Sequence, residues 1–260
     1  MRSEDVSRHG WFARPRPNPQ ASLRLFCFPF AGGGASTFRA WPDALPLSVE
    51  VVAVELPGRE TRIRERPFRS LDALVDELMA RLPPQLDRPF AFFGHSMGAL
   101  VAYELSCALR RAGRLEPICL IVSGAGPPHV PNPHRPVHEL PDDELRTQLR
   151  RLNGTPAAVL DHGELMKIFF PLLRADLAVC ETHVYRPSPP LDCPILAFGG
   201  KDDRVVTEQR LERWRERSQA VFASWMLPGD HFFLMSAQRL LLWIIGGELE
   251  RIAGQMRRTA

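Results

Sequence analysis

The sequence lacks a hydrophobic run that could cross a membrane. The longest apolar run near the C-terminus, Leu240–Ile245, has six residues, whereas a membrane-spanning helix needs about 20. The first residues carry charges of both signs, including Arg2 and Glu4, and they contain no apolar segment of the kind found in secretory signals. We therefore expect a cytoplasmic protein that has no membrane contact.

The sequence also lacks paired cysteines. The cysteines are odd in number and dispersed, none has C-x-x-C spacing, and most stand in apolar stretches: Cys27, Cys107, Cys119, Cys180 and Cys193. This pattern is typical of buried, reduced thiols and argues against both a disulfide framework and a structural zinc site. We expect a reducing compartment and no bound metal.

A strong charge of one sign is absent, because the net charge is only +3. That value is too small to indicate a nucleic-acid partner. Nearly all the basic residues are arginines, since the only lysines are Lys167 and Lys201. One segment, residues 58–69, is denser in positive charge. Its simplest interpretation is a solvated loop, and the alternative is a contact for an acidic partner.

Apolar segments alternate with helical patterns along most of the chain, which is long enough at 260 residues to bury a full core. This alternation predicts an α/β fold, in which helices cover both faces of a mostly parallel sheet. Residues 1–20 are expected to form an extended N-terminal segment, and residues 21–126 and 191–260 the α/β core. Ligands of such sheets bind beyond the carboxyl ends of the strands.

The pentapeptide Gly94–Gly98 fits the pattern G-x-S-x-G. An apolar run precedes it from Phe90, and a helical pattern follows it from Ala99. This setting is that of the nucleophile elbow of α/β-hydrolases, in which the serine has a strained backbone and an exposed hydroxyl. The alternative is a chance match in which the serine is only a turn residue. The strand, turn and helix favour Ser96 as a nucleophile.

A serine hydroxyl needs an adjacent base, and in this fold the triad follows the chain order nucleophile, acid, histidine. His231 follows the last predicted strand, and Asp202 follows the strand Ile195–Phe198 and two glycines. We predict His231 as the base and Asp202 as the acid that orients it. Asp202 is the first acidic residue after the expected glycine turn, so it could face back toward the sheet. Asp203 and then Asp230 are the alternatives.

The negative charge that develops on an acyl oxygen needs backbone N–H donors. One predicted donor is the amide of Met97, which directly follows Ser96 at the start of a helix. The other should come from the glycine-rich loop at residues 28–34, which resembles the HGGG-type element of esterases without its histidine. We predict the amide of Ala31, with Phe30 as the alternative. A flexible turn without a role is the simpler interpretation of this loop.

Residues 127–190 interrupt the alternation because they contain no strand pattern. Leu145, Leu149 and Leu152 recur at helical spacing, as do the apolar residues between 165 and 173. Pro171 should kink or restart the second of these helices. A structural satellite is one interpretation of this insertion. Its place between two strands whose ends flank the predicted site favours a helical lid with an apolar inner wall.

Five segments resemble those of the type II, or editing, thioesterases of polyketide and nonribosomal peptide pathways, within the α/β-hydrolase superfamily. They are Phe28–Gly33, Leu56–Arg59, Gly94–Gly98, Gly199–Asp203 and Gly229–Phe233. The resemblance covers about residues 21–252 in the same order. It implies that the family's triad falls on Ser96, Asp202 and His231.

The resemblance further implies a discrete hydrolase that acts in trans. Such enzymes remove stray acyl groups from the phosphopantetheine arm of acyl or peptidyl carrier domains. Carrier domains are usually acidic, so Arg59, Arg62 and Arg64 become candidate contacts. No metal or organic cofactor is implied beyond the phosphopantetheine of the substrate, and a monomer is the default.

Three alternative functions stay open. A general carboxylesterase or lipase would use the same triad on the same fold. A cyclising thioesterase domain cut from a synthase is less favoured, because the chain begins at Met1 without a preceding carrier-domain serine motif. A non-catalytic binding protein with a hydrolase fold would not need a complete triad. The sequence predicts neither the acyl group nor the partner synthase.

Overall fold

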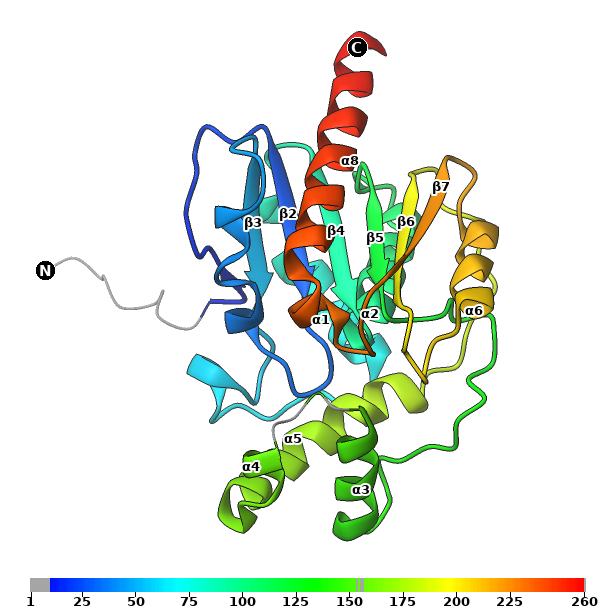
Figure 1. Ribbon diagram of the computed structural model, residues 1–260. Helices are drawn as coiled ribbons and strands as arrows, with labels where there is room; N and C mark the ends of the chain where they lie inside the picture. Colours follow the sequence, from blue (N-terminus) through cyan, green and yellow to red (C-terminus); the bar gives the residue numbers. More distant parts are fainter. Residues whose placement is uncertain (1–9, 153, 155–156, 260) are drawn as a thin grey trace, which may run out of the picture.

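The computed structural model describes residues 10–152, 154 and 157–259. Residues 1–9 of the predicted N-terminal segment and residues 153, 155 and 156 of the predicted lid therefore lie outside the described residues. A seven-stranded sheet in the order β1-β3-β2-β4-β5-β6-β7 forms the centre of the molecule (Figure 1). The strands are β1 (Phe12–Ala13), β2 (Leu23–Phe28), β3 (Val49–Val54), β4 (Phe90–His95), β5 (Leu120–Ser123), β6 (Ile195–Gly200) and β7 (Phe222–Leu227).

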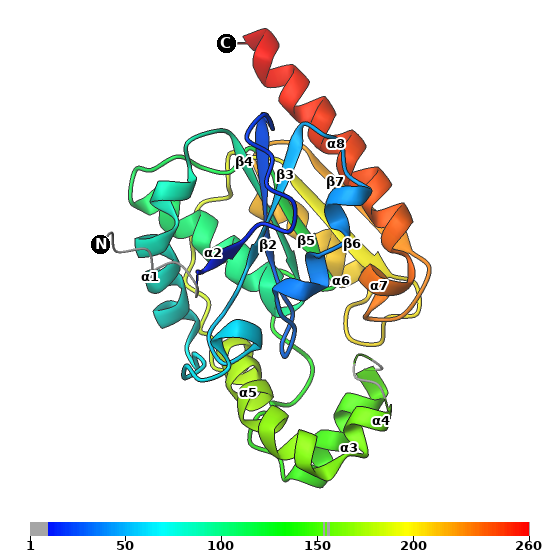
Figure 2. The ribbon, with the colours of Figure 1, turned by 90° about the vertical axis from the view of Figure 1, so that its left-hand side faces the viewer.

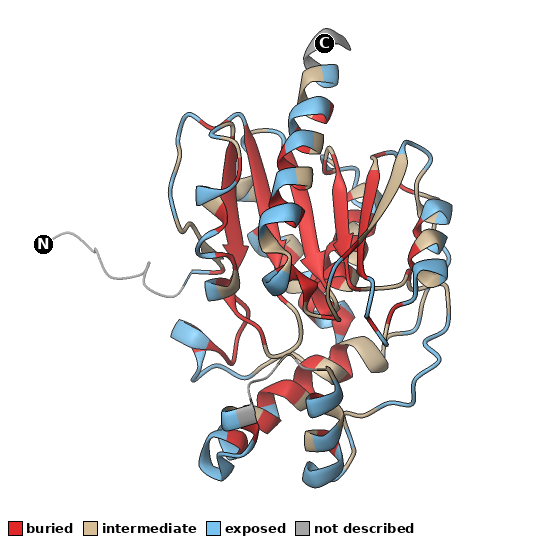
Figure 3. Ribbon diagram, in the orientation of Figure 1, coloured by how far each residue is buried: buried red, intermediate tan, exposed pale blue. Residues whose placement is uncertain are grey.

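The sheet is mostly parallel, as the sequence predicts. The short β1 pairs with β3 in the antiparallel sense, and the pairs from β3–β2 to β6–β7 are parallel. Every residue of β2, β3, β4 and β6 is buried, so these strands form the red centre of Figure 3. Because side chains of a strand alternate between the two faces, both faces must be covered by other elements. The α/β-hydrolase architecture is confirmed.

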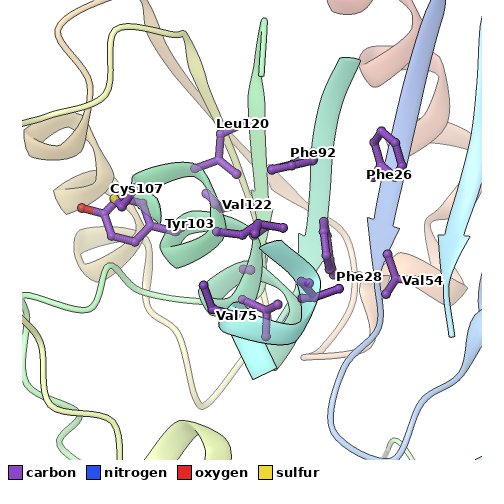
Figure 4. Packing of buried hydrophobic residues seen from close by; sticks show 14 of the residues in the cluster. Phe26, Phe28, Val54, Val75, Phe92, Tyr103, Cys107, Leu120 and Val122 are labelled. Atoms are coloured by element: carbon purple, nitrogen blue, oxygen red, sulfur yellow. The ribbon is translucent and has the colours of Figure 1, made fainter. Parts of the chain in front are cut away.

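Helices supply this cover on the two faces (Figure 2). On one face, Phe26 and Phe28 of β2 belong to a cluster with Val75 of α1 and Tyr103 of α2 (Figure 4). On the other face, the cluster that contains Cys27 of β2 includes residues of α8 and of the short 3-10 turns η1 and η2. The elements of these two layers are α1 (Leu71–Arg81), α2 (Met97–Arg111), α6 (Glu208–Glu212), α7 (Phe233–Ser236), α8 (Gln238–Thr259), η1 (Ala35–Phe38) and η2 (Trp41–Asp43).

The insertion at residues 127–190 is helical and lies at the carboxyl ends of the strands (Figure 1). It contains α3 (Asp142–Leu152), α4 (Ala157–Leu160) and α5 (Gly163–Glu181). Its inner side chains form a cluster of their own, separate from the two clusters of the sheet. No helix in the described part of the chain is long and apolar enough to span a membrane.

Of the kink or restart predicted at Pro171, the restart is wrong, because the helix α5 is continuous across this residue; the kink stays a prediction. A proline removes one N–H donor from a helix. Phe170 and Leu173, on either side of it, are buried in the cluster of the insertion. Val179, further along α5, belongs to the core of the sheet. Tertiary packing on both sides of the proline therefore stabilises the continuous helix.

Candidate active site

Ser96 stands on a sharp turn between β4 and α2. Its backbone angles, φ 54° and ψ −114°, lie outside the regions that non-glycine residues ordinarily adopt. The flanking glycines explain how the turn closes. A Cβ at Gly94 would lie 2.0 Å from the carbonyl oxygen of Gly98, and a Cβ at Gly98 would lie 2.1 Å from that of Phe28. The G-x-S-x-G spacing is therefore a steric requirement of this elbow.

A chain of hydrogen bonds runs from Ser96 to a buried carboxylate. The Ser96 Oγ lies 3.2 Å from Nε2 of His231, and Nδ1 of His231 lies 2.8 Å from Oδ2 of Asp203. The other oxygen of Asp203 accepts the N–H groups of Val205 and Val206 at 2.7 and 3.1 Å. These bonds fix the carboxylate, which in turn directs Nδ1–H of the imidazole. Nε2 is then available to accept the proton of Ser96.

Asp203, and not Asp202, faces His231, so the choice of Asp202 from the sequence is wrong. The reason is that β6 continues through Gly200, which pairs with Leu227 of β7. The two glycines belong to the strand, and the turn comes afterwards, closed by the N–H of Asp203 and the carbonyl of Gly200 at 3.2 Å. Asp202 is at the exposed corner, while Asp203 is buried. Asp230, the third candidate, lies in the turn after β7, where its carboxylate accepts the N–H of Phe232.

His95, the second residue of the motif, packs against the proposed base. The ring centroids of His95 and His231 are 5.3 Å apart, and Nδ1 of His95 lies 2.9 Å from the hydroxyl of Ser123. Complete burial and then the nearby His231 lower the pKa of His95 well below its usual value of 6.5. His95 is therefore neutral at pH 7. It adds no positive charge beside His231 when that residue accepts a proton.

The glycine-rich loop after β2 is an ordered turn. The N–H of Gly33 donates to the carbonyl of Phe30 at 2.8 Å, which makes Ala31 and Gly32 the two central residues. Gly32 has φ +79°, the value that the second central residue of a type II turn requires. The loop is therefore an ordered turn and not the flexible one of the simpler interpretation.

The structure places the two predicted amide donors, Ala31 and Met97, on elements that border the nucleophile's cavity. Ala31 lines the same cavity as Ser96 and His231. Met97 is the first residue of α2, where backbone N–H groups have no partner within the helix. Both positions agree with the predicted oxyanion hole, and the donor role of the two amides stays a prediction.

Two cavities meet at Ser96. One, of about 480 Å³, lies between the glycine-rich turn and the insertion, and its walls are largely apolar: Phe30, Leu149, Val159, Phe169, Leu172, Leu173, Leu177 and Phe232. The other, of about 440 Å³, is lined by residues of the segment 124–136 together with polar groups such as His183 and Arg210. A third cavity, of about 610 Å³ beside α8, contains none of the three hydrogen-bonded residues. The nucleophile thus faces an apolar space on one side and a more polar one on the other.

The arginines predicted to contact a partner differ in their surroundings. Arg59 is 4% exposed and forms an ion pair with Asp176, and Arg62 is 5% exposed and hydrogen-bonds to the carbonyl of Glu55. Neither side chain is accessible, so their assignment as contacts is wrong. Arg64 is exposed. In the part of the chain that the structure describes, no group of three or more His, Cys, Asp or Glu side chains could hold a metal ion.

Comparison with known proteins identifies the family. The thioesterase domain family matches residues 23–247. The chain belongs to the thioesterase family. The gramicidin S biosynthesis protein GrsT of Aneurinibacillus migulanus is 46% identical to this thioesterase over 228 residues, which cover 88% of this chain and 89% of GrsT.

Solved structures of similar sequence have the same fold. RedJ, the thioesterase from the prodiginine biosynthetic pathway in Streptomyces coelicolor, is 42% identical, with a TM-score of 0.82 over 91% of this thioesterase and 94% of RedJ. The type II thioesterase BorB from the borrelidin biosynthetic cluster is 36% identical, with a TM-score of 0.84 over 93% of this chain and 99% of BorB. Both matches extend over the insertion as well as the sheet.

One buried carboxylate of the thioesterase was not singled out from the sequence. Asp176 stands on α5 three residues after Leu173 and four after Leu172, which places it on the apolar face of that helix. It is 2% exposed. A charge within an apolar stripe is the signal that could have drawn attention to it, because buried carboxylates almost always have a partner.

Proposed function

We propose that this thioesterase hydrolyses acyl thioesters on the phosphopantetheine arms of acyl or peptidyl carrier domains, and so removes aberrant acyl groups from polyketide or nonribosomal peptide synthases. The observation that carries the proposal is the hydrogen-bonded chain Ser96–His231–Asp203 at the junction of two cavities. The pathways named for GrsT, RedJ and BorB support the same substrate class.

The first half of the reaction forms an acyl-enzyme. Nε2 of His231 accepts the proton of the Ser96 hydroxyl as Oγ attacks the thioester carbonyl carbon, and Asp203 stabilises the resulting imidazolium. The carbonyl oxygen becomes an oxyanion that accepts the N–H groups of Met97 and Ala31. The intermediate then collapses, the carbon–sulfur bond breaks, and His231 gives its proton to the leaving sulfur. The pantetheine arm departs as a free thiol.

The second half releases the acyl group. Water attacks the ester carbon on Ser96, and His231 accepts a proton from that water. The same two amides stabilise the second oxyanion. When the bond to Oγ breaks, His231 returns the proton to Ser96 and the carboxylic acid leaves. The proposed cycle needs no cofactor beyond the phosphopantetheine of the substrate.

The two cavities assign places to the two parts of the substrate. The acyl group would occupy the apolar cavity beneath the insertion, because its burial there removes hydrocarbon surface from water. The pantetheine arm, which carries amides and a hydroxyl, would lie in the more polar cavity beside Arg210. Ser96 lines both cavities, so a thioester carbonyl between the two parts would lie at its hydroxyl.

An exposed basic segment would favour acidic carrier domains. Arg64, Arg66 and Arg69 are exposed, and they follow Arg59, Glu60 and Ile63, which line the apolar cavity. Charges at the rim of an interface mainly raise the rate of association. We propose that this segment contacts the carrier and that the thioesterase acts as a monomer.

The test compares kcat/KM for an acyl-carrier thioester, the matching acyl-pantetheine and the matching oxygen ester. We expect a preference for both thioesters, and a loss of at least ~10³-fold in Ser96→Ala, because members of a triad act as a unit. Preference for the oxygen ester by a wide margin would show a general esterase. Formation of lactones alone would show a cyclising enzyme.

The same assay tests the carrier contact with a matched pair of variants. Arg64→Glu should lower kcat/KM for the acyl-carrier substrate about tenfold at low salt, and it should leave the acyl-pantetheine value unchanged. Arg114→Glu is the control, because Arg114 is also exposed but precedes β5, at the amino ends of the strands and away from the active site. Equal effects of the two variants would show only a general loss of positive charge.

A further inference from the structure

A buried ion pair joins the sheet to the insertion beside the active site. Nη2 of Arg59 lies 2.7 Å from Oδ1 of Asp176, and Nη1 lies 2.8 Å from Oδ2. The two side chains are 4% and 3% exposed. Arg59 comes from the segment after β3, whereas Asp176 comes from α5. The geometry is the bidentate one, in which a guanidinium and a carboxylate bind most strongly.

The same two residues hold the turn Phe30–Gly33 from two sides. Oδ2 of Asp176 accepts the N–H of Gly32 at 2.7 Å, and Nη1 of Arg59 donates to the carbonyl oxygen of Gly33 at 2.8 Å. The turn's own bond joins Gly33 to Phe30. The peptide groups that directly follow Ala31 are therefore fixed by three hydrogen bonds, two of which come from the ion pair.

Stability alone does not explain this arrangement. Two charges lose their hydration when they are buried, and the attraction between them often no more than offsets this loss. An apolar pair of similar volume would fill the same space at comparable or lower free energy. What an apolar pair cannot do is accept the N–H of Gly32 and donate to the carbonyl of Gly33.

We propose that Arg59 and Asp176 are positioning residues that fix the Ala31 amide for the oxyanion. The pair acts through the turn and not on the reacting atoms. It also makes the shape of the turn depend on the place of α5, so that the insertion contributes to the oxyanion hole as well as to the acyl cavity. The inference rests on the proposed function, because it assigns a second role within the same acyl-transfer site.

The first variant is Asp176→Asn, which keeps the size of the side chain and removes its charge. We expect kcat to fall by about 10- to 100-fold, because a small misplacement of a reacting or stabilising group has an effect of this size. KM should stay within about twofold. The affinity for an acyl trifluoromethyl ketone, whose adduct on Ser96 carries an oxyanion, should fall by the same factor as kcat/KM. A merely structural role would not link these three values.

The control is another buried ion pair, Arg24 with Glu50, at the amino ends of β2 and β3. Glu50→Gln should lower the free energy of unfolding and leave kcat, KM and ketone affinity unchanged. The second test variant is the double substitution Arg59→Met with Asp176→Leu, which removes both charges and keeps the core filled. We expect it to fold and to have the low kcat of Asp176→Asn.

Several results would overturn the inference. They are wild-type kcat in a folded double variant, a rise in KM without a fall in kcat, and failure of both variants to fold, since the pair would then serve the fold itself. These results differ from failure of the proposed function. In that case the wild-type protein itself would hydrolyse no carrier-bound thioester and form no adduct with the ketone.

Discussion

Asp202 and Asp203 are neighbours in the chain and have opposite surroundings. Asp203 accepts hydrogen bonds from His231, Val205 and Val206, whereas Asp202 is exposed. A carboxylate orients an imidazole only if it is itself held in place and sheltered from water. The two side chains are chemically identical and adjacent in the chain, so the difference between their surroundings comes from the turn.

This difference gives a sharp pair of variants. Asp203→Asn should lower kcat by about 10⁴-fold, since an amide that donates to His231 favours the wrong tautomer of the ring. Asp202→Asn should stay within about twofold of the wild type. Steady-state hydrolysis of an acyl-pantetheine measures both. A large loss in Asp202→Asn with an active Asp203→Asn would contradict the geometry.

His95 gives a prediction for the dependence of stability on pH. Its pKa in the folded protein is lowered well below 6.5 by burial and by His231, so the unfolded chain binds a proton there more readily. The stabilising contribution is complete above about pH 6.5 and is lost as the pH falls below that value, by up to about 1.4 kcal/mol per pH unit.

The comparison of wild type with His95→Gln isolates this contribution. Glutamine does not titrate, so the free energy of unfolding of the variant should fall less steeply between pH 7.5 and 5. Urea denaturation at several pH values measures both slopes. Other groups that titrate in this range, such as His129, are common to both proteins and cancel. Equal slopes would mean that the pKa of His95 is the same in the folded protein as in the unfolded chain.

At the scale of elements, strand length decides which residues meet. The G-x-S-x-G motif and the position of His231 after the last strand are local signals. They predicted Ser96 and His231, which the structure brings within hydrogen-bond distance. The acid was missed because β6 extends two residues beyond the apolar run and pairs Gly199 and Gly200 with β7. Pairing between strands is not encoded within five residues, so the sequence left Asp202, Asp203 and Asp230 as candidates for the acid.

A single methyl group should disturb the turn Phe30–Gly33. Gly32 has a φ of +79°, which an alanine rarely adopts, and the Cβ of Gly32→Ala would lie 2.7 Å from Cζ of Phe169 on α5. We expect kcat to fall by about 10- to 100-fold because the Ala31 amide moves. The free energy of unfolding should fall by about 1–3 kcal/mol from the backbone strain.

Gly113→Ala is the matched control for this effect. Gly113 also has a positive φ, of +62°, but a Cβ there meets nothing within 4 Å. It should show the backbone strain alone, with a loss of stability of about 1 kcal/mol and an unchanged kcat. Thermal unfolding and steady-state kinetics of the two variants separate the roles. An active Gly32→Ala would show that the turn tolerates displacement.

At the scale of the whole molecule, α5 joins the core of the sheet to the insertion. Val179 packs in the core of the sheet, while Met166 and Phe170 pack in the cluster of the insertion. Arg59 and Asp176 meet across 117 residues of sequence. Helical spacing predicted the helices of the insertion, but it could not show that an arginine of a basic segment would be buried against one of them. Burial of this kind depends on the assembled molecule.

The site therefore combines local and global determinants. Ser96 is placed by a turn that five residues specify, whereas Asp203, the glycine-rich turn and the apolar cavity depend on neighbouring strands and on the insertion. The family resemblance of five short segments predicted the fold and the class of enzyme. The contacts of Arg59 and Arg62 could be corrected only when their burial was known.

The proposed reaction forms a covalent acyl-enzyme on Ser96, which His231 activates. Rapid-quench mass spectrometry of the thioesterase mixed with an acyl-pantetheine thioester tests it most directly, with peptide mapping of the trapped protein. We predict a transient mass increase equal to the acyl group on the peptide that contains Ser96, and neither this adduct nor hydrolysis in Ser96→Ala. Hydrolysis by Ser96→Ala at a rate near that of the wild type, or an acyl group on another residue, would contradict this mechanism.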